Sequence, residues 1–442
     1  MAKAKKEAAL TPEERLQAAL VPDWEWPYKL PGNWCWTYLT KAAECLDNFR
    51  KPINATERAG RNGNVPYYGA TGQVGWIDDF LTDEDLVLLG EDGAPFLDLI
   101  KDKAYLITGK AWVNNHAHIL RSLFGDTGNR YLLHYLNSFN YAGYVNGTTR
   151  LKLTQASMDT IPIPLPPLAE QQRIVDRIES LFAKLDEAKE KAQAVVDSFE
   201  TRKAAILHKA FTGELTKKWR KSANTRWVYK KIKDCCKLGS GGTPSRKVPD
   251  FYKGDIPWIK TGEIEWNDIY DTEEKITQSA IDNSSARCYK PGVVLVAMYG
   301  MGVTRGKASI LRVQAATNQA VCVLEPQSAL LYNRYLLYYF MRNYWDIREK
   351  AVGGNQLNLS LTIIKELNIE IPPIDEQVEI VQILDDLFAK EQQTKEAAEA
   401  VLDQIGLMKK SILARAFRGE LGTNDPSEES AVELLKEIIR RG

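Results

Sequence analysis

The sequence has no surplus of charge of either sign. Its 442 residues contain 58 Lys and Arg against 58 Asp and Glu, so the chain as a whole lacks the basic excess usual in nucleic-acid binders. No run approaches the roughly 20 apolar residues that a membrane-spanning helix needs. The first residues, MAKAKKEAALTPEERL, carry basic side chains with no apolar stretch behind them, which is unlike a signal peptide. These absences predict a soluble protein of the cytoplasm.

The usual signatures of chemistry are also missing. The six cysteines, Cys35, Cys45, Cys235, Cys236, Cys288 and Cys322, form no C-x-x-C pair and no zinc spacing, which is typical of core thiols in a reducing compartment. His116 and His118 alternate at strand spacing, but nothing nearby completes a ligand set, so we expect no metal site. There is no Ser/His/Asp order, no H-E-x-x-H and no Asn/Asp-Pro-Pro-aromatic tetrad of amino-methyltransferases. We therefore expect this chain to catalyse nothing.

What the sequence does contain is a long internal repeat. The segment from Pro166, PPLAEQQRIVDRIESLFAKLDEAKEKAQAVVDSFETRKAAILHKAFTGEL, aligns without a gap with a segment from Pro372, at an offset of 206. Roughly half the positions are identical. The matched pairs include Pro166/Pro372, Glu170/Glu376, Gln171/Gln377, Phe182/Phe388, Phe211/Phe417 and Gly213/Gly419. A weaker echo relates NRYLLHY at Asn129 to NRYLLYY at Asn333. The chain is thus two copies of one plan, a globular region followed by a long helix, and the repeat predicts a pseudo-two-fold axis.

Each copy of the repeat predicts a long amphipathic helix. In the first copy, apolar residues recur at alternating spacings of four and three, which is the heptad seam of a coiled coil. The predicted seam consists of Ile178, Leu181, Leu185, Ala192, Val195 and Phe199 with Leu384, Leu387, Ala398, Val401 and Ile405. Glu391 and Thr394 interrupt the second seam, which predicts either a device that fixes the register or a solvent gap. Prolines before each helix and glycines after it delimit about 40 residues, or a length of about 60 Å.

The two long helices are natural partners for each other, because a lone amphipathic helix would leave its apolar stripe in water. A two-fold axis perpendicular to them would make the pair antiparallel. The alternative, in which each helix packs on its own globular region, stays open at this point.

The globular regions are predicted to be mixed. Short apolar runs at 86–89, 104–107 and 293–296 indicate strands, and 130–135 and 334–343 indicate helices. We therefore predict an α+β fold, with two mixed domains joined by two long helices in an antiparallel coiled coil. The predicted boundaries are an N-terminal extension 1–27, a first domain 28–165, a central helix 166–213, a second domain 214–371, a C-terminal helix 372–419 and a tail 420–442 with a short helix.

The neutral total hides an asymmetry between the two domains. From Tyr28 to Leu165 there are 13 basic residues against 14 acidic ones, whereas from Lys217 to Glu370 there are 24 against 15. The second region therefore favours a polyanionic partner. The first would need a local patch or a partner protein to hold DNA.

Several loops could contact DNA. The stretch from Gly300 to Lys307 resembles a phosphate loop, but Ala308 stands where such a loop needs Ser or Thr, and the glycine spacing is one short. It is interpreted instead as a strand-to-strand loop that presents cations to the DNA backbone, or as a plain turn. The Gly239–Lys247 loop is a second candidate, with a solvated surface loop as its alternative.

Asn, Gln and Arg can also contact base edges, although such residues often only cap turns. The DNA-binding candidates are Arg58, Arg61, Asn62, Asn64, Tyr67, Lys110, Ser240, Thr243, Arg246, Lys247, Lys260, Tyr299, Arg305, Lys307, Asn318, Gln319, Asn355 and Gln356.

These motifs together resemble a known family. IPIPLPPLAEQQRIVDRIESLFAKLD with KAAILHKAFTGELTKKWR, and IEIPPIDEQVEIVQILDDLFAK with KKSILARAFRGEL, resemble the two helical repeats of type I restriction-modification specificity subunits. GGTPSRKVPDFYKGDIPWIKTGEIEWNDI and PGVVLVAMYGMGVTRGKASILRVQAATNQAVCVLEP resemble a target-recognition domain. The resemblance covers nearly the whole chain after about Pro27. The first domain departs from the pattern, since Leu88–Gly93 stands where the second copy has Val296–Gly300.

The resemblance implies a DNA-reading scaffold. Each domain would read one half of a split DNA site, and the paired helices would set the unread spacer. Two modification subunits would dock on the helices and methylate adenine with S-adenosylmethionine, and restriction subunits would add ATP-driven translocation and cleavage. Those cofactors, Mg²⁺ included, would bind the partners, and this chain would bind none. The alternatives are a fused methyltransferase-endonuclease, which would need a cofactor motif that is missing, and a coiled-coil scaffold with no DNA role, which the basic second domain disfavours.

Overall fold

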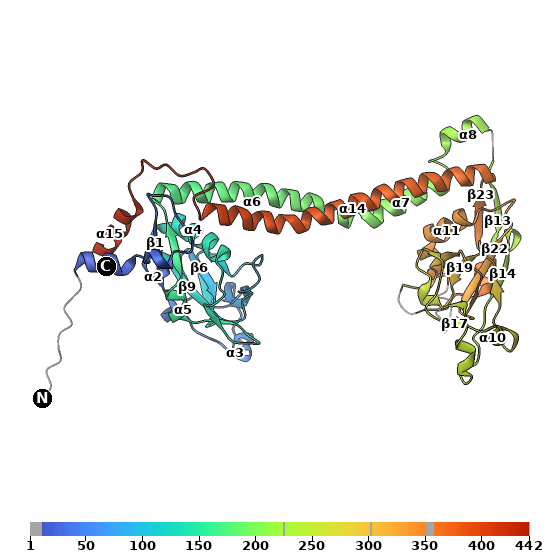
Figure 1. Ribbon diagram of the computed structural model, residues 1–442, viewed down its shortest axis with the longest axis horizontal. Helices are drawn as coiled ribbons and strands as arrows, with labels where there is room; N and C mark the ends of the chain where they lie inside the picture. Colours follow the sequence, from blue (N-terminus) through green and yellow to red (C-terminus); the bar gives the residue numbers. More distant parts are fainter. Residues whose placement is uncertain (1–10, 224–225, 301–302, 351–357, 442) are drawn as a thin grey trace. The chain divides into compact units, whose positions relative to one another are not determined.

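The computed structural model describes residues 11–223, 226–300, 303–350 and 358–441 (Figure 1). The chain forms two compact units, one of 1–193 with 399–442 and the other of 194–398. We call residues 28–165 the first head and 214–371 the second head. Each unit thus contains one head together with parts of both long helices.

The first head is built on two four-stranded sheets. One has the order β2-β9-β6-β7 and is antiparallel throughout, and the other has the order β4-β3-β8-β5, in which β3 and β8 run parallel. The strands are β2 (Ala43–Cys45), β3 (Val65–Gly69), β4 (Gly72–Ile77), β5 (Thr82–Asp83), β6 (Leu86–Gly90), β7 (Ala104–Ile107), β8 (Lys110–Val113) and β9 (Ala117–Ser122). The apolar runs predicted as strands at 86–89 and 104–107 are therefore confirmed.

The second head repeats this topology. Its sheets have the orders β14-β22-β19-β20-β16 and β17-β15-β21-β18, and β15 and β21 form the parallel pair that corresponds to β3 and β8. The strands are β14 (Cys236–Ser240), β15 (Ile256–Ile259), β16 (Asp268–Ile269), β17 (Lys275–Ile276), β18 (Cys288–Tyr289), β19 (Val294–Ala297), β20 (Ala308–Leu311), β21 (Ala315–Thr317) and β22 (Val321–Pro326). Apart from the extra strand β16, the two heads share one strand order, so the chain holds two copies of one mixed α/β domain.

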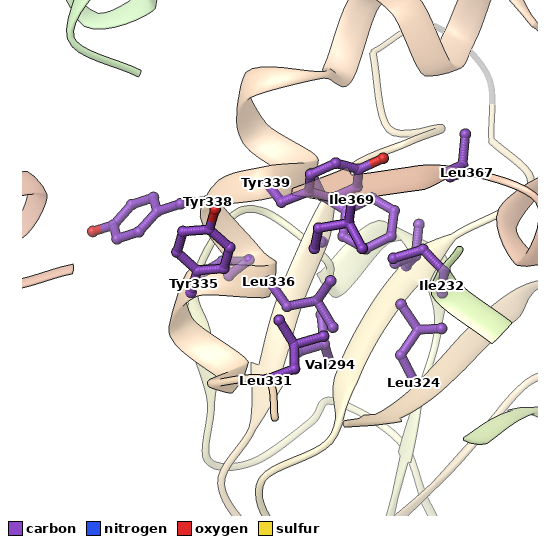
Figure 2. Close-up of a cluster of buried hydrophobic side chains, with 14 of the residues drawn as sticks. Ile232, Val294, Leu324, Leu331, Tyr335, Leu336, Tyr338, Tyr339, Leu367 and Ile369 are labelled. Carbon is purple, nitrogen blue, oxygen red and sulfur yellow. The ribbon is translucent and has the colours of Figure 1, made fainter. Parts of the chain in front are cut away.

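The echo between the two NRYLL motifs has a structural reason. The motifs lie in α4 (Gly125–Ser138) and α11 (Asn333–Arg342). Tyr131 donates to the carbonyl of Pro164 at 2.6 Å, and Tyr335 donates to that of Glu370 at 2.8 Å. These acceptors lie on equivalent strands, β12 (Pro162–Leu165) and β23 (Asn368–Ile371), which pair with β1 (Cys35–Tyr38) and β13 (Val228–Lys231). In Figure 2, Leu336 and Tyr339 of the second head's helix lie beside Val294 and Ile369 of its strands, whereas Tyr338 points away from them.

The long helices begin and end where the sequence predicts, but the first is interrupted. It consists of α6 (Leu168–Asp197) and α7 (Phe199–Phe211), whereas the second is the continuous α14 (Ile374–Ala416). At the break, the Ser198 hydroxyl donates to the carbonyl of Ala194 at 2.6 Å, and Arg202 donates to that of Val195 at 3.1 Å. Side chains that take up carbonyls of the helical ladder interrupt it locally.

The two helices contact each other within each unit, as the pairing hypothesis expects. In the second unit, Arg202 forms an ion pair with Glu391 at 2.7 Å. In the first unit, Lys409 forms one with Asp186 at 2.6 Å.

The seam of α14 differs by one residue from the predicted one. Val401 is 41% exposed, and its neighbour Leu402 is half-buried. Glu391, which interrupts the predicted seam, is half-buried in the ion pair with Arg202. The partly buried positions in this part of α14 include Phe388, Glu391 and Lys395. A seam assigned from apolar residues alone therefore leaves out the polar residues Glu391 and Lys395.

The end of each long helix packs on the head of the other repeat. Phe417, just after α14, lies 5.3 Å from the Tyr131 ring and 5.1 Å from the Tyr135 ring of the first head. Phe211, at the end of α7, lies 4.8 Å from the Tyr335 ring of the second head. The start of each helix contributes to the core of its own head, so the alternative that the sequence left open is also partly realised.

A buried glutamate reinforces this exchange of helix ends. Glu170, at the start of α6, accepts hydrogen bonds from Thr423 at 2.7 Å and from Arg173 at 3.1 Å. Glu376, at the start of α14, accepts from Thr216 at 2.7 Å and from Arg220 at 2.9 Å. Burial raises the pKa of Glu170, against the opposing effect of its donors. The segment that follows each helix thus caps the start of the other helix.

The first and the last helix of the described residues pack together in the first unit. α1 (Pro12–Ala19), which the sequence analysis does not predict, packs with α15 (Ala431–Arg441), the short helix expected in the tail. The other described α-helices and strands are α2 (Leu39–Ala42), α3 (Ala55–Ala59), α5 (Gln155–Asp159), α8 (Lys217–Ala223), α9 (Ile232–Cys235), α10 (Gln278–Asp282), α12 (Tyr344–Glu349), α13 (Leu361–Lys365), β10 (Val145–Asn146) and β11 (Lys152–Leu153). All six cysteines are free thiols, and among the described helices none is long and apolar enough to cross a bilayer.

The exchange of helix ends makes a testable prediction about stability. We expect Phe211→Ala to destabilise the second unit, and Phe417→Ala the first, by about 3–5 kcal/mol each, since each leaves a cavity among buried rings. In hydrogen exchange read by mass spectrometry, Phe211→Ala should speed exchange in α11 and leave α4 unchanged, and Phe417→Ala should do the reverse. Glu200→Ala, at an exposed site on α7, is the control. Faster exchange in both heads with either variant would contradict the assignment.

Candidate nucleic-acid interface

In each head, an arginine lies over an aromatic ring of the second sheet. The Arg58 guanidinium is 4.7 Å from the ring centroid of Tyr67 on β3. The Arg246 guanidinium is 5.3 Å from that of Trp258 on β15 and 4.1 Å from that of Tyr252. Because β3 and β15 hold the same place in the repeated sheet order, the two arginines lie over equivalent strands. Stacking orients a guanidinium, whose planar fork suits two-point recognition of guanine or phosphate.

The structure brings most of the predicted residues of the first head together around this arginine. Arg58 lies on α3, and Arg61, Asn62 and Asn64 follow before β3. Arg61 forms an ion pair with Asp78 and lies 4.7 Å from the ring centroid of Trp112 on β8. Asn62 and Asn64 are exposed.

Two further predicted residues of the first head, Lys110 and Tyr67, lie in different surroundings. Lys110 begins β8 and lies 4.6 Å from the ring centroid of Phe80. Tyr67 is only 1% exposed, and its ring supports Arg58 from below. The prediction that Tyr67 faces DNA therefore needs correction, because alternation along β3 turns its side chain into the core.

The glycines of the Gly239–Lys247 loop in the second head are required by contacts within the domain, and not by a close approach to DNA. A Cβ on Gly241 would lie 1.7 Å from the Thr317 carbonyl oxygen, and one on Gly242 would lie 2.2 Å from the Ser285 hydroxyl. The backbone there is pressed against its own domain. Of the predicted residues in and beside this loop, Thr243 donates to the side chain of Gln319, the carbonyl of Ser240 accepts from Tyr289, and Lys247 is exposed.

Three cations predicted to contact DNA are paired with carboxylates of their own domain. Arg246 contacts Glu274 at 2.8 Å, Lys260 contacts Glu273 at 3.0 Å, and Lys307 contacts Glu265. The hydrogen bond with Glu274 raises the pKa of Arg246, and the bond with Glu273 raises that of Lys260. A phosphate that binds these side chains has to displace a carboxylate or share the cation with it.

The loop that leads to Lys307 is held by α12, whose role the sequence analysis missed. Tyr344 donates to the carbonyl of Val303, and Arg348 donates to that of Arg305 at 2.6 Å. Tyr299, before the loop, is 42% exposed. The run of aromatic and basic residues in NYWDIR was the available signal for this contact.

The remaining amide candidates are of two kinds. The Asn318 side chain accepts from the backbone of Ala320 at 3.1 Å, which is a turn cap. Asn355 and Gln356 lie outside the residues that the structure describes.

Asp47, Glu91 and His118 come together in the first head in the manner of metal ligands. Arg50 contacts both carboxylates, and the two ring nitrogens of His118 contact Asp47 at 2.6 Å and the Leu153 carbonyl at 3.0 Å. Burial raises the pKa of Asp47, but the hydrogen bond with His118 and the nearby charges bring it below its ordinary value. The cluster is thus an ion-pair network that ties β9 to the loops around it.

Comparison with known proteins places this architecture in a family. The model of the type I restriction modification DNA specificity domain matches residues 46–196 and 224–402. A putative type I restriction enzyme specificity subunit of Haemophilus influenzae is 29% identical, over 78% of this chain and 86% of its own length. The EcoKI specificity subunit of Escherichia coli is 26% identical over 70% of each chain.

Solved structures show the same fold. A chain from a type I R-M system, whose structure concerns complex assembly and conformational transition, superposes with a TM-score of 0.61 at 17% identity, over 89% of this chain and all of that one. The HsdS subunit from Thermoanaerobacter tengcongensis gives 0.58 at 18% identity, over 90% of this chain and all of its own. The two heads, the repeated helices and the family match together show that this chain belongs to the specificity subunits of type I restriction-modification systems, their non-catalytic DNA-recognition component.

Proposed function

We propose that this chain reads a bipartite DNA site, one half with each head. The observation that carries the proposal is the repeated head, in which one strand order places Arg58 and Arg246 over equivalent strands. Two similar but unequal readers in one chain fit a split, asymmetric site. In such an interface, contacts to phosphates position each reader, and contacts to base edges specify the sequence.

The paired helices, in this proposal, form an antiparallel coiled coil that sets the spacer between the half-sites. In the second unit, residue numbers rise along one helix as they fall along the other, since Phe199 contacts Lys395 and Arg202 contacts Glu391. In the first unit, Phe182 and Asp186 both contact Lys409. Polar pairs between helices are a known means of fixing their register, and the half-buried Arg202 and Glu391 are the candidates for that role here.

The modification subunits would dock on the helices. Leu407 and Met408 on α14 are exposed, and Met408 lines a groove of about 320 Å³ with Leu181 and Leu185 of α6. Apolar side chains exposed together on a protein surface mark sites of protein contact.

S-adenosylmethionine, ATP and Mg²⁺ would be held by the modification and restriction subunits, and this chain would bind none of them. The complex would act on DNA in the cytoplasm.

Exchange of the second head tests the proposal directly. We expect a chain in which residues 217–370 are replaced by those of a related subunit to direct methylation to a motif that differs in one half-site only. The measurement is methylome sequencing of cells that express the chain with its modification subunit. A motif changed in both halves, or no bipartite motif with the parent chain, would contradict the proposal.

The stacked arginines should matter for base choice rather than for charge alone. Arg58→Lys and Arg246→Lys keep the charge but lose the planar fork, so each should weaken discrimination in one half-site by about 1–3 kcal/mol. The same sequencing would show a relaxed base at one position, in a different half for each variant. Arg226→Lys, at an exposed arginine of the second head outside the candidate set, should leave the motif intact.

Insertion of one heptad into both helices, after Lys191 and after Leu402, tests the spacer. Seven residues lengthen a helix by about 10 Å, so the spacer should grow by roughly three base pairs with both half-sites unchanged. An insertion into one helix alone breaks the register and should abolish methylation. An unchanged spacer with the double insertion would refute the proposed role of the helices.

A further inference from the structure

The second head has a basic groove whose residues belong to none of the predicted DNA-binding loops. It has a volume of about 380 Å³ and lies between β14, β18 and β22. Leu238, Val293 and Val323 supply apolar lining, whereas Lys237, Arg287 and Lys290 are exposed cations beside them. Glu325, also exposed, is the one acidic residue among the lining residues.

The three cations have no carboxylate partner among the described residues. Glu325 stands opposite Lys237 in the pairing of β14 with β22, yet the two side chains form no ion pair. By contrast, Arg246, Lys260 and Lys307 are each paired with a glutamate. No carboxylate is therefore bonded to the cations of the groove, which leaves them available to an anion from outside the chain, although Glu325 lowers the net charge of the groove by one.

The groove is also held in shape. Tyr289 lies between Arg287 and Lys290 in the sequence, and its hydroxyl donates to the Ser240 carbonyl at 2.9 Å. This bond ties β18 to the end of β14. A Cβ on Gly239 would lie 2.7 Å from the Tyr289 hydroxyl, so a larger residue would push the two strands apart. The cations from the two strands are thus brought beside one groove before any ligand binds.

The first head lacks a comparable group of unpaired cations at the corresponding place among its described residues. Its strand β2 follows a short helix as β14 does, and carries Glu44 where β14 carries Lys237. Opposite Glu44 stands Arg121, which contacts Glu44 at 3.0 Å and also Glu84. The unpaired cations are therefore not a requirement of the shared fold.

We propose that Lys237, Arg287 and Lys290 hold the phosphates of the DNA backbone and so position the second head, with no part in base choice. This inference rests on the proposed function and assigns a surface to it. A duplex is a regular array of phosphates, and cations flanking a groove suit it better than they suit an apolar protein surface.

The test is the salt dependence of DNA binding by the full chain in complex with its modification subunit. Binding of a duplex that carries the methylated motif, and of one that lacks it, is measured at several KCl concentrations for the parent and for K237A/R287A/K290A. Each lost phosphate contact reduces the slope of log K against log[KCl] by about 0.9, so the slope should fall by about two to three units on both duplexes. The motif found by methylome sequencing should stay the same.

A matched variant separates the groove from net charge. K233A/K253A/K275A also removes three positive charges from the second head, but each of these lysines is ion-paired within the chain, to Glu366, Asp250 and Asp271. Its slope should stay close to that of the parent, and the conservative K237R/R287K/K290R should behave like the parent, which controls for folding. Equal slopes for both alanine variants, or a changed motif, would overturn the inference. If methylome sequencing found no bipartite motif with the parent chain, that result would instead contradict the proposed function.

Discussion

The contact between the end of each long helix and the head of the other repeat is the interaction on which the rest of the structure depends. In the second unit, the Tyr335 hydroxyl donates a hydrogen bond to the Glu370 carbonyl, and Phe211 packs against the Tyr335 ring. In the first unit, Tyr131 and Phe417 make the same contacts. One tyrosine in each head therefore joins three pieces, which are the helix of the head, the strand before the next long helix and the end of the opposite long helix. A head with only its own helix would lack part of its core.

The buried glutamates at the start of each long helix also join it to the other repeat. A carboxylate without partners is costly to bury, so Glu170 and Glu376 are tolerable only where Thr423 and Thr216 reach them. These threonines follow the opposite long helix, so both ends of each helix are fixed by residues from both repeats. Because the strands before the helices are bonded to the tyrosines as well, the junction of each head with its helix has little freedom. A reader whose base contacts depend on position gains from such a junction.

The features predicted from sequence are those with local or repeated signals. The helix limits follow from prolines and glycines, the apolar strands from their runs, and the duplicated plan from the gapless repeat. Sheet order, in contrast, is set by contacts between residues far apart in the chain, which a local pattern does not encode. The break at Ser198 and the half-buried Glu391 depend on hydrogen bonds made by Arg202, whose direction no spacing reveals. Residue type alone marks the candidate cations, and it does not reveal that Arg246 and Lys307 face glutamates 28 and 42 residues away.

The two heads also show which parts of the fold are free to vary. Their strand order and tyrosine contacts are shared, because the core and the junction with the helices depend on them. The stacked arginines are shared as well. The outer faces of β2 and β14 are not shared, since Glu44 and Arg121 neutralise each other where Lys237 stands unpaired. The surface charge of a head can thus change without any change to its strand order or to its junction with the helices. Under the proposed function, its affinity for DNA would change with that charge. Contacts of charge with phosphate supply much of the affinity of proteins for DNA. Under the proposed phosphate contacts, the basic second head would supply more of the binding free energy, and the near-neutral first head would rely more on base contacts and on the partner subunits.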